Sequence, residues 1–187
     1  SGIDLGQRKL KTIRRGRGAQ MMVPCVIDKV ERRNTAVLED LIFAKAHTNR
    51  PIKMAVPGPM TVVDTTYDEV YGDEEALAMD VAAALNLEIL DLQRAGCDVV
   101  QIDEPAMTRY HEKTADYGAR ALDRCLEGVN IPTIVHLCYG YPLNQTLQHE
   151  YEYPELLEIL MDTKIGGFSL EFARSDYDPS ILRGCGD

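Results

Sequence analysis

The stretch DVVQIDEP, residues 98–105, indicates the fold class of this chain. Its first five residues are rich in β-branched side chains and predict a short strand, which the two carboxylates and Pro105 bring to an end. Before this strand, residues 73–96 carry apolar side chains at helical spacing, and Asp73 is placed to cap that helix. A second helix is expected over roughly residues 115–126. The strand therefore lies between two helices.

The same alternation extends in both directions along the chain. Further strands are expected at residues 21–27, 52–56, 133–135 and 167–170, and further helices at residues 36–44 and 154–161. Strands that alternate with helices predict an α/β fold with a parallel sheet, either an open doubly wound sheet or a barrel. The sequence holds no Gly-x-Gly-x-x-Gly and no Walker loop after a strand, which argues against a nucleotide-binding open sheet.

Composition limits the classes of function. The chain has 187 residues, of which 45% are hydrophobic and 27% charged, and we expect one domain of a cytoplasmic protein with no membrane contact. A net charge of −10 argues against nucleic-acid binding. Residues 8–17 hold six basic residues and could form a phosphate-binding patch, but a flexible basic segment over residues 1–20 is the preferred interpretation. The five cysteines form no CxxC pair, and we expect reduced thiols.

Polar residues gather where the expected strands end. His136 and Cys138 follow one strand, and Glu171 follows the next. In an extended chain, residues two apart point to the same face, and histidine, cysteine and glutamate are all zinc ligands. Three protein ligands with one open position are typical of a catalytic zinc site. The spacing alone favours the alternative, in which Cys138 fills the core and His136 is an ordinary hydrogen-bonded histidine.

The adjacent carboxylates Asp103 and Glu104 also leave two interpretations open. Neighbouring residues of a strand point to opposite faces, so one carboxylate could cap the next helix or pair with Arg109. Alternatively, Asp103 faces the end of the sheet and binds a cationic group such as an amine. The spacing does not decide between them.

Four motifs in order carry a resemblance to a known family. VPGPMTV (56–62), VVQIDEPAM (99–107), VHLCYG (135–140) and GFSLEFARSD (167–176) are similar to successive strand-end motifs in the C-terminal catalytic barrel of the cobalamin-independent methionine synthases. The resemblance implies a (β/α)8 TIM barrel, incomplete here, with about five βα units over residues 21–187. It also implies a zinc-dependent methyltransferase of methionine biosynthesis that methylates a small thiol such as homocysteine.

The resemblance assigns roles to five residues. His136, Cys138 and Glu171 match zinc ligands, and Asp103 matches the carboxylate that holds the amino group of homocysteine. Asp116 matches, more loosely, an acidic residue near the reaction centre. Zinc would stabilise the thiolate form of the substrate, which is the nucleophile.

The sequence also departs from the family pattern. The family has a further zinc-ligand cysteine on a later strand, and Cys185 follows Glu171 too soon to match it. Folate-using members carry a tryptophan after the Gly-Pro motif, and this chain has no tryptophan, which argues against a folate donor. Both a folate and a corrinoid are kept as possible methyl donors. Alternatives are alkyl transfer to another thiol, as in epoxide:coenzyme M transferases, and a truncated, non-catalytic barrel fragment. Open sheet edges would favour a homo-oligomer.

Overall fold

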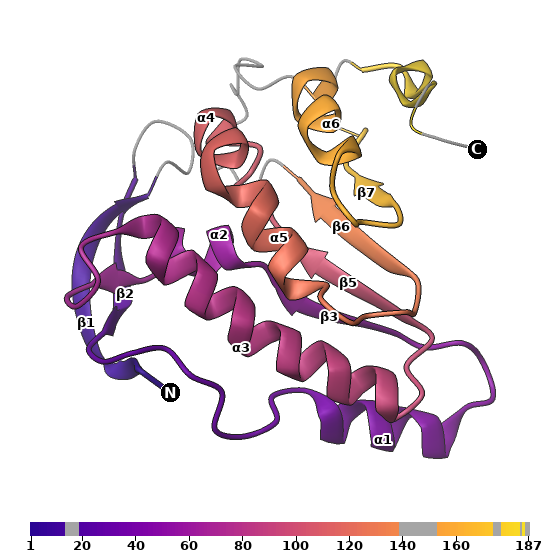
Figure 1. Ribbon diagram of the computed structural model, residues 1–187, viewed down its shortest axis with the longest axis horizontal. Helices are drawn as coiled ribbons and strands as arrows, with labels where there is room; N and C mark the ends of the chain where they lie inside the picture. The colour runs from indigo at the N-terminus through magenta and orange to yellow at the C-terminus, as the bar shows by residue number, and fades with distance from the viewer. Residues whose placement is uncertain (14–18, 139–152, 174–176, 184, 186–187) are drawn as a thin grey trace.

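The main sheet is parallel and follows chain order. The computed structural model describes residues 1–13, 19–138, 153–173, 177–183 and 185. Four strands form the main sheet, in the order β3 (Lys53–Pro57), β5 (Val99–Asp103), β6 (Thr133–Leu137) and β7 (Phe168–Leu170) (Figure 1). Consecutive strands are neighbours, as in a barrel, whereas a doubly wound sheet reverses its order. The prediction of an α/β fold with a parallel sheet is confirmed.

Three helices cover one face of this sheet: α3 (Glu74–Arg94), α5 (Ala119–Cys125) and α6 (Tyr153–Met161) (Figure 1). The N-terminus of α3 is capped as predicted, because the Asp73 carboxylate accepts hydrogen bonds from the backbone N–H groups of Glu75 at 2.9 Å and Ala76 at 3.2 Å. Gly96, just beyond the helix, adopts a φ of +80°, which few other residues tolerate. Local sequence therefore sets both ends of this helix.

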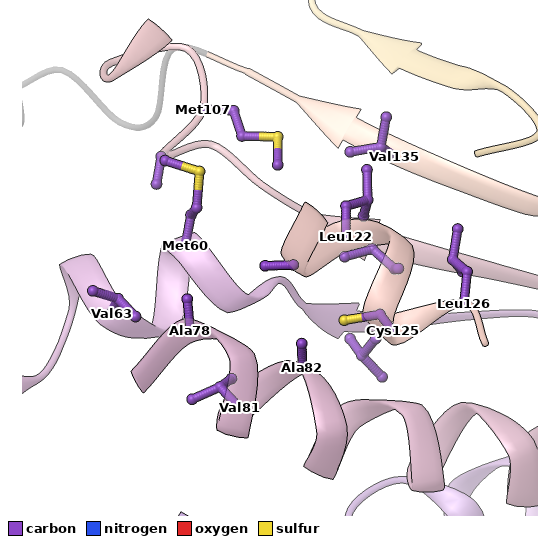
Figure 2. Packing of buried hydrophobic residues seen from close by; sticks show 14 of the residues in the cluster. Met60, Val63, Ala78, Val81, Ala82, Met107, Leu122, Cys125, Leu126 and Val135 are labelled. Carbon is purple, nitrogen blue, oxygen red and sulfur yellow. The ribbon is translucent and has the colours of Figure 1, made fainter. Parts of the chain in front are cut away.

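The core lies between the sheet and these helices. Figure 2 shows Ala82 of α3 and Leu122 of α5 among the buried side chains that pack against Val135 of the sheet. Cys125 is buried in the same cluster, and all five cysteines are free thiols, as expected. Burial of this apolar surface against the sheet is the main stabilisation available to the chain.

The structure differs from the flexible segment expected at residues 1–20 over the part of that segment that it describes. Residues Ile3–Ile13 form a long strand, β1, which pairs antiparallel with β2 (Ala19–Val26), while β2 pairs in parallel with the short β4 (Tyr67–Asp68). The basic side chains of β1 find partners: Lys9 pairs with Glu69, and Lys11 Nζ donates to the carbonyls of Val63 and Thr66, both at 2.7 Å. These contacts let a highly charged segment form a strand. The expected strand at residues 21–27 accordingly belongs to this second sheet.

Shorter elements complete the structure. They are α1 (Leu38–His47), α2 (Pro59–Asp64), α4 (His111–Lys113), a π-helical turn at Thr114–Gly118 and a 3-10 turn at Pro179–Leu182. Pro59 begins α2, where its fixed φ suits the first position of a helix. Within the described ranges, none of the helices is both long and apolar enough to cross a membrane.

Candidate active site

The candidate residues lie at one edge of the main sheet. Asp103 is the register partner of Pro57 on one side and of His136 on the other, and His136 is in turn the partner of Ser169. Cys138 directly follows β6, and Glu171 directly follows β7. The backbones of four of the five predicted residues are therefore brought to the same edge, which is the C-terminal edge expected for a barrel site.

Asp103 and His136 point away from the helices. Val100 and Ile102 in β5 are fully buried under the helical layer, whereas Asp103 is only half-buried. In β6, Val135 is likewise fully buried and His136 is half-buried. Because successive side chains of a strand alternate between faces, Asp103 and His136 share the face opposite the helices.

The ring orientation of His136 is set by the next strand. Its Nδ1 lies 3.0 Å from the carbonyl oxygen of Ser169 and 3.2 Å from Ser169 Oγ. A carbonyl oxygen only accepts hydrogen bonds, so Nδ1 is the donor in this contact, and in the neutral ring Nε2 would be the nitrogen with the lone pair. Histidines that bind metals are held in the same way, with one nitrogen donating to a neighbour and the other facing the ion.

The ends of β6 and β7 are joined by Tyr153. Its buried hydroxyl lies 3.3 Å from the Leu137 carbonyl and 3.2 Å from the Glu171 carbonyl, and it accepts a hydrogen bond from the Glu171 N–H at 3.3 Å. The carbonyl of Cys138 accepts a hydrogen bond of 2.8 Å from Thr108 Oγ. These contacts fix the backbone positions of Cys138 and Glu171.

The three predicted zinc ligands offer nitrogen, sulfur and oxygen donors, a set that suits zinc. His136, Cys138 and Glu171 fit the metal by donor type, and the contact with Ser169 involves Nδ1 of His136 and not Nε2. Among the side chains that the structure describes, no three or more His, Cys, Asp or Glu groups are placed so that they could hold a metal ion. Zinc ligation by these residues therefore stays a prediction.

Glu104 does not pair with Arg109 and does not cap the following helix. It is completely buried, and its Oε1 accepts a hydrogen bond of 2.9 Å from the backbone N–H of Met60. Its Oε2 accepts two bonds from Thr61, from the N–H at 2.9 Å and from Oγ at 2.8 Å. Glu104 thus caps the preceding helix, α2. Burial raises its pKa to about 7, although the hydrogen bonds from Thr61 and Met60 act in the opposite direction.

The backbone around Glu104 ties three strand ends together. The N–H of Glu104 donates to the carbonyl of His136 at 2.9 Å, and the N–H of Gly58 donates to the carbonyl of Asp103 at 2.8 Å.

Arg109, which the sequence offered as a partner for one of the adjacent carboxylates, pairs with Asp64, with 2.7 Å between Nη2 and Oδ2. Both of those side chains are buried at the far end of α2.

Asp116 is not brought to this edge. It is exposed on the π-helical turn in the helical layer, where its negative charge acts on Arg120, a residue whose guanidinium pairs with Glu75. Its proposed catalytic role stays a prediction. Two further residues of the strand-end motifs, Arg174 and Asp176, lie outside the described residues.

Comparisons with known proteins agree with this geometry. The family model described as the catalytic domain of the cobalamin-independent synthases matches residues 10–180. The chain belongs to the cobalamin-independent synthase family. The resemblance found in the four strand-end motifs is therefore confirmed.

Individual members of the family match over much of this chain. A methionine synthase from Pyrococcus abyssi is 30% identical over 152 residues, which are 81% of this chain and 41% of that protein. One from Saccharolobus solfataricus is 35% identical over 119 residues, 63% of this chain and 35% of that protein. The chain thus spans less than half the length of these curated relatives.

Solved structures extend the comparison to the fold. A B12-independent methionine synthase from Shewanella sp. W3-18-1, in complex with selenomethionine, is 38% identical, with a TM-score of 0.89 over 97% of this chain and 55% of that chain. The putative vitamin-B12 independent methionine synthase from Listeria monocytogenes, at 18% identity and a TM-score of 0.59, supports the fold alone. The incomplete barrel expected from the sequence agrees with both matches.

Proposed function

We propose that this chain contributes to a zinc-dependent methyl transfer from a folate donor to the thiol of homocysteine. The observation that carries the proposal is the pairing of Asp103 with His136 at the C-terminal edge of the sheet, with the proton of His136 held on Nδ1 by Ser169. Family membership supports the reaction, and the Shewanella relative binds selenomethionine, an analogue of the methylated product.

The proposed roles follow from donor chemistry. His136 through Nε2, Cys138 as a thiolate and Glu171 as a carboxylate would hold zinc, which when bound stabilises the thiolate of the substrate at neutral pH. Asp103 would bind the substrate ammonium group and so orient the sulfur. The substrate thiol loses its proton, its sulfur attacks the methyl carbon, and the bond from methyl to donor breaks with its electron pair left on the donor.

The family favours this reaction over the other expectations. A corrinoid donor finds no support in a family described as cobalamin-independent. The relatives are methionine synthases, which favours homocysteine over coenzyme M as the thiol.

Zinc content of the protein, produced at its native length, tests the ligand set. We expect about one zinc per chain in the wild type, and a loss of affinity of at least tenfold in His136→Ala and Cys138→Ser. Cys97→Ser is the matched control, because Cys97 is buried elsewhere and its Sγ contacts the carbonyl of Val99 at 3.1 Å. Equal zinc binding in the wild type and His136→Ala would refute the assignment.

A further inference from the structure

A row of polar side chains runs toward Asp103 along the face of the sheet opposite the helices. Lys53 Nζ donates to Gln101 Oε1 at 2.6 Å, and Gln101 Nε2 donates to Asp103 Oδ1 at 2.7 Å. We propose that Gln101, held by Lys53, is a positioning residue that orients the Asp103 carboxylate to receive the ammonium group of an amino-acid substrate. This inference rests on the proposed function, in which Asp103 binds that group.

The direction of the Gln101 amide is set by its two neighbours. A lysine ammonium only donates hydrogen bonds, and an ionised carboxylate only accepts them. The amide oxygen must therefore face Lys53 and the amide nitrogen must face Asp103, because a flipped amide would lose both bonds. Gln101 is thus a directional link between a cation and the carboxylate.

The sheet places these three groups together. Gln101 and Asp103 are two residues apart in β5, so they share a face, and this is the face opposite the buried Val100 and Ile102. On the neighbouring strand Ala55 is the register partner of Gln101, and Lys53 lies two residues earlier on the same face. At the other end of the row, Asp103 is the register partner of His136.

This arrangement leaves one carboxylate oxygen for a ligand. Among the described residues, the side-chain hydrogen bond to the Asp103 carboxylate ends on Oδ1, so Oδ2 is the oxygen to which we assign the substrate ammonium. Holding Oδ1 fixes the plane of the carboxylate before the ligand arrives, which lowers the ordering cost of binding. Loss of Gln101 should therefore weaken recognition of the ammonium group and leave the zinc ligands unaffected.

The test compares two thiols that differ only in the amino group. We would measure the Kd of L-homocysteine and of 4-mercaptobutanoate, which lacks the amino group, by calorimetry on the zinc-loaded protein produced at its native length. In Gln101→Leu we expect roughly tenfold weaker binding of homocysteine, as for the loss of a hydrogen bond to a charged group, and unchanged binding of 4-mercaptobutanoate. Zinc content should stay at the wild-type level.

Lys53→Met provides a second variant, on the neighbouring strand β3. Lys53→Met should weaken homocysteine binding by a smaller factor than Gln101→Leu does. The double variant should bind homocysteine as weakly as Gln101→Leu alone, since Lys53 acts on Asp103 only through Gln101. Lys45→Met is the matched control, because the Lys45 ammonium donates to the Gly96 carbonyl at the end of α3, away from the site.

Two outcomes overturn the inference: an equal loss of affinity for both thiols, or no loss in either variant. Asp103→Asn separates this failure from failure of the proposed function. If Asp103→Asn does not reduce the preference for homocysteine over 4-mercaptobutanoate, Asp103 does not bind the ammonium group. If Asp103→Asn removes the preference and Gln101→Leu does not affect it, only the role of Gln101 is wrong.

Discussion

Replacing Gly58 by alanine should destabilise the protein through one buried side chain. A Cβ added at Gly58 would lie 2.2 Å from Cδ and 2.3 Å from Cγ of Glu104, far inside van der Waals contact. The φ of Gly58 is −85°, which alanine adopts without strain, so the effect would come from the clash alone. Glu104 is completely buried and cannot swing into solvent to relieve the clash.

The expected magnitude follows from the bonds that Glu104 would lose. Its carboxylate accepts three hydrogen bonds, one from Met60 and two from Thr61, and moving it aside should break at least two of them. Hydrogen bonds to a charged group contribute about 1.5–3 kcal/mol each, so losing two of them should lower the free energy of unfolding by about 3–6 kcal/mol. This is a large share of the roughly 5–15 kcal/mol that stabilises a typical domain.

Urea denaturation at pH 8, where Glu104 is ionised, would measure this change through the midpoint of unfolding. The control is Gly6→Ala, because a Cβ at Gly6 meets only the Asp4 carboxylate, at 3.3 Å, on the exposed β1 strand. The double variant Gly58→Ala/Glu104→Ala should be no less stable than Glu104→Ala alone, since the clash is then gone. A loss below about 0.5 kcal/mol in Gly58→Ala would refute the reasoning.

Three further predictions concern the same region and the helix beside it. Arg109→Met should lower the free energy of unfolding by about 3–5 kcal/mol in urea titrations, because it leaves the buried Asp64 carboxylate without its ion pair; a near-neutral result would contradict this. The pKa of Glu104 is about 7 in the folded state, above its ordinary value of 4.5. Between these two pH values the folded protein keeps a proton on Glu104 that the unfolded chain has lost. The stability of the wild type relative to Glu104→Gln should therefore fall by roughly 3 kcal/mol as the pH rises through that window, and a difference that does not vary with pH would show that the carboxyl is not perturbed. Asp73→Ala should cost about 1 kcal/mol and lower Tm by several degrees, with Asp73→Asn retaining most of the cap, and equal losses in the two variants would argue against capping.

Local sequence predicted the elements whose boundaries depend on nearby residues. The helix from Asp73 to Gly96 carries its own cap and stop signal, and β5 is ended by its own carboxylates and proline. The β1 strand was missed because its charges resemble a solvated loop. Its stability depends on distant partners, the Glu69 carboxylate and the carbonyls that accept from Lys11.

In the candidate site, too, some residues could be predicted from the sequence and others could not. The strand-end rule correctly placed Asp103 and His136 at one edge of the sheet, since only their positions at the ends of parallel strands were needed. The contributions of Ser169, Gln101 and Glu104 depend on strand register and on a contact with α2, and the sequence does not specify either. An alternation of polar residues at positions 101 and 103 was the one available signal for Gln101.

X-ray absorption at the zinc edge, on the protein produced at its native length, tests the central claim most directly. We predict a zinc shell that contains nitrogen and sulfur, and loses nitrogen scattering in His136→Ala and sulfur scattering in Cys138→Ser. Adding homocysteine should bring one more sulfur to about 2.3 Å from the metal. A zinc shell that His136→Ala and Cys138→Ser leave unchanged, or one that gains no sulfur from homocysteine, would contradict the account.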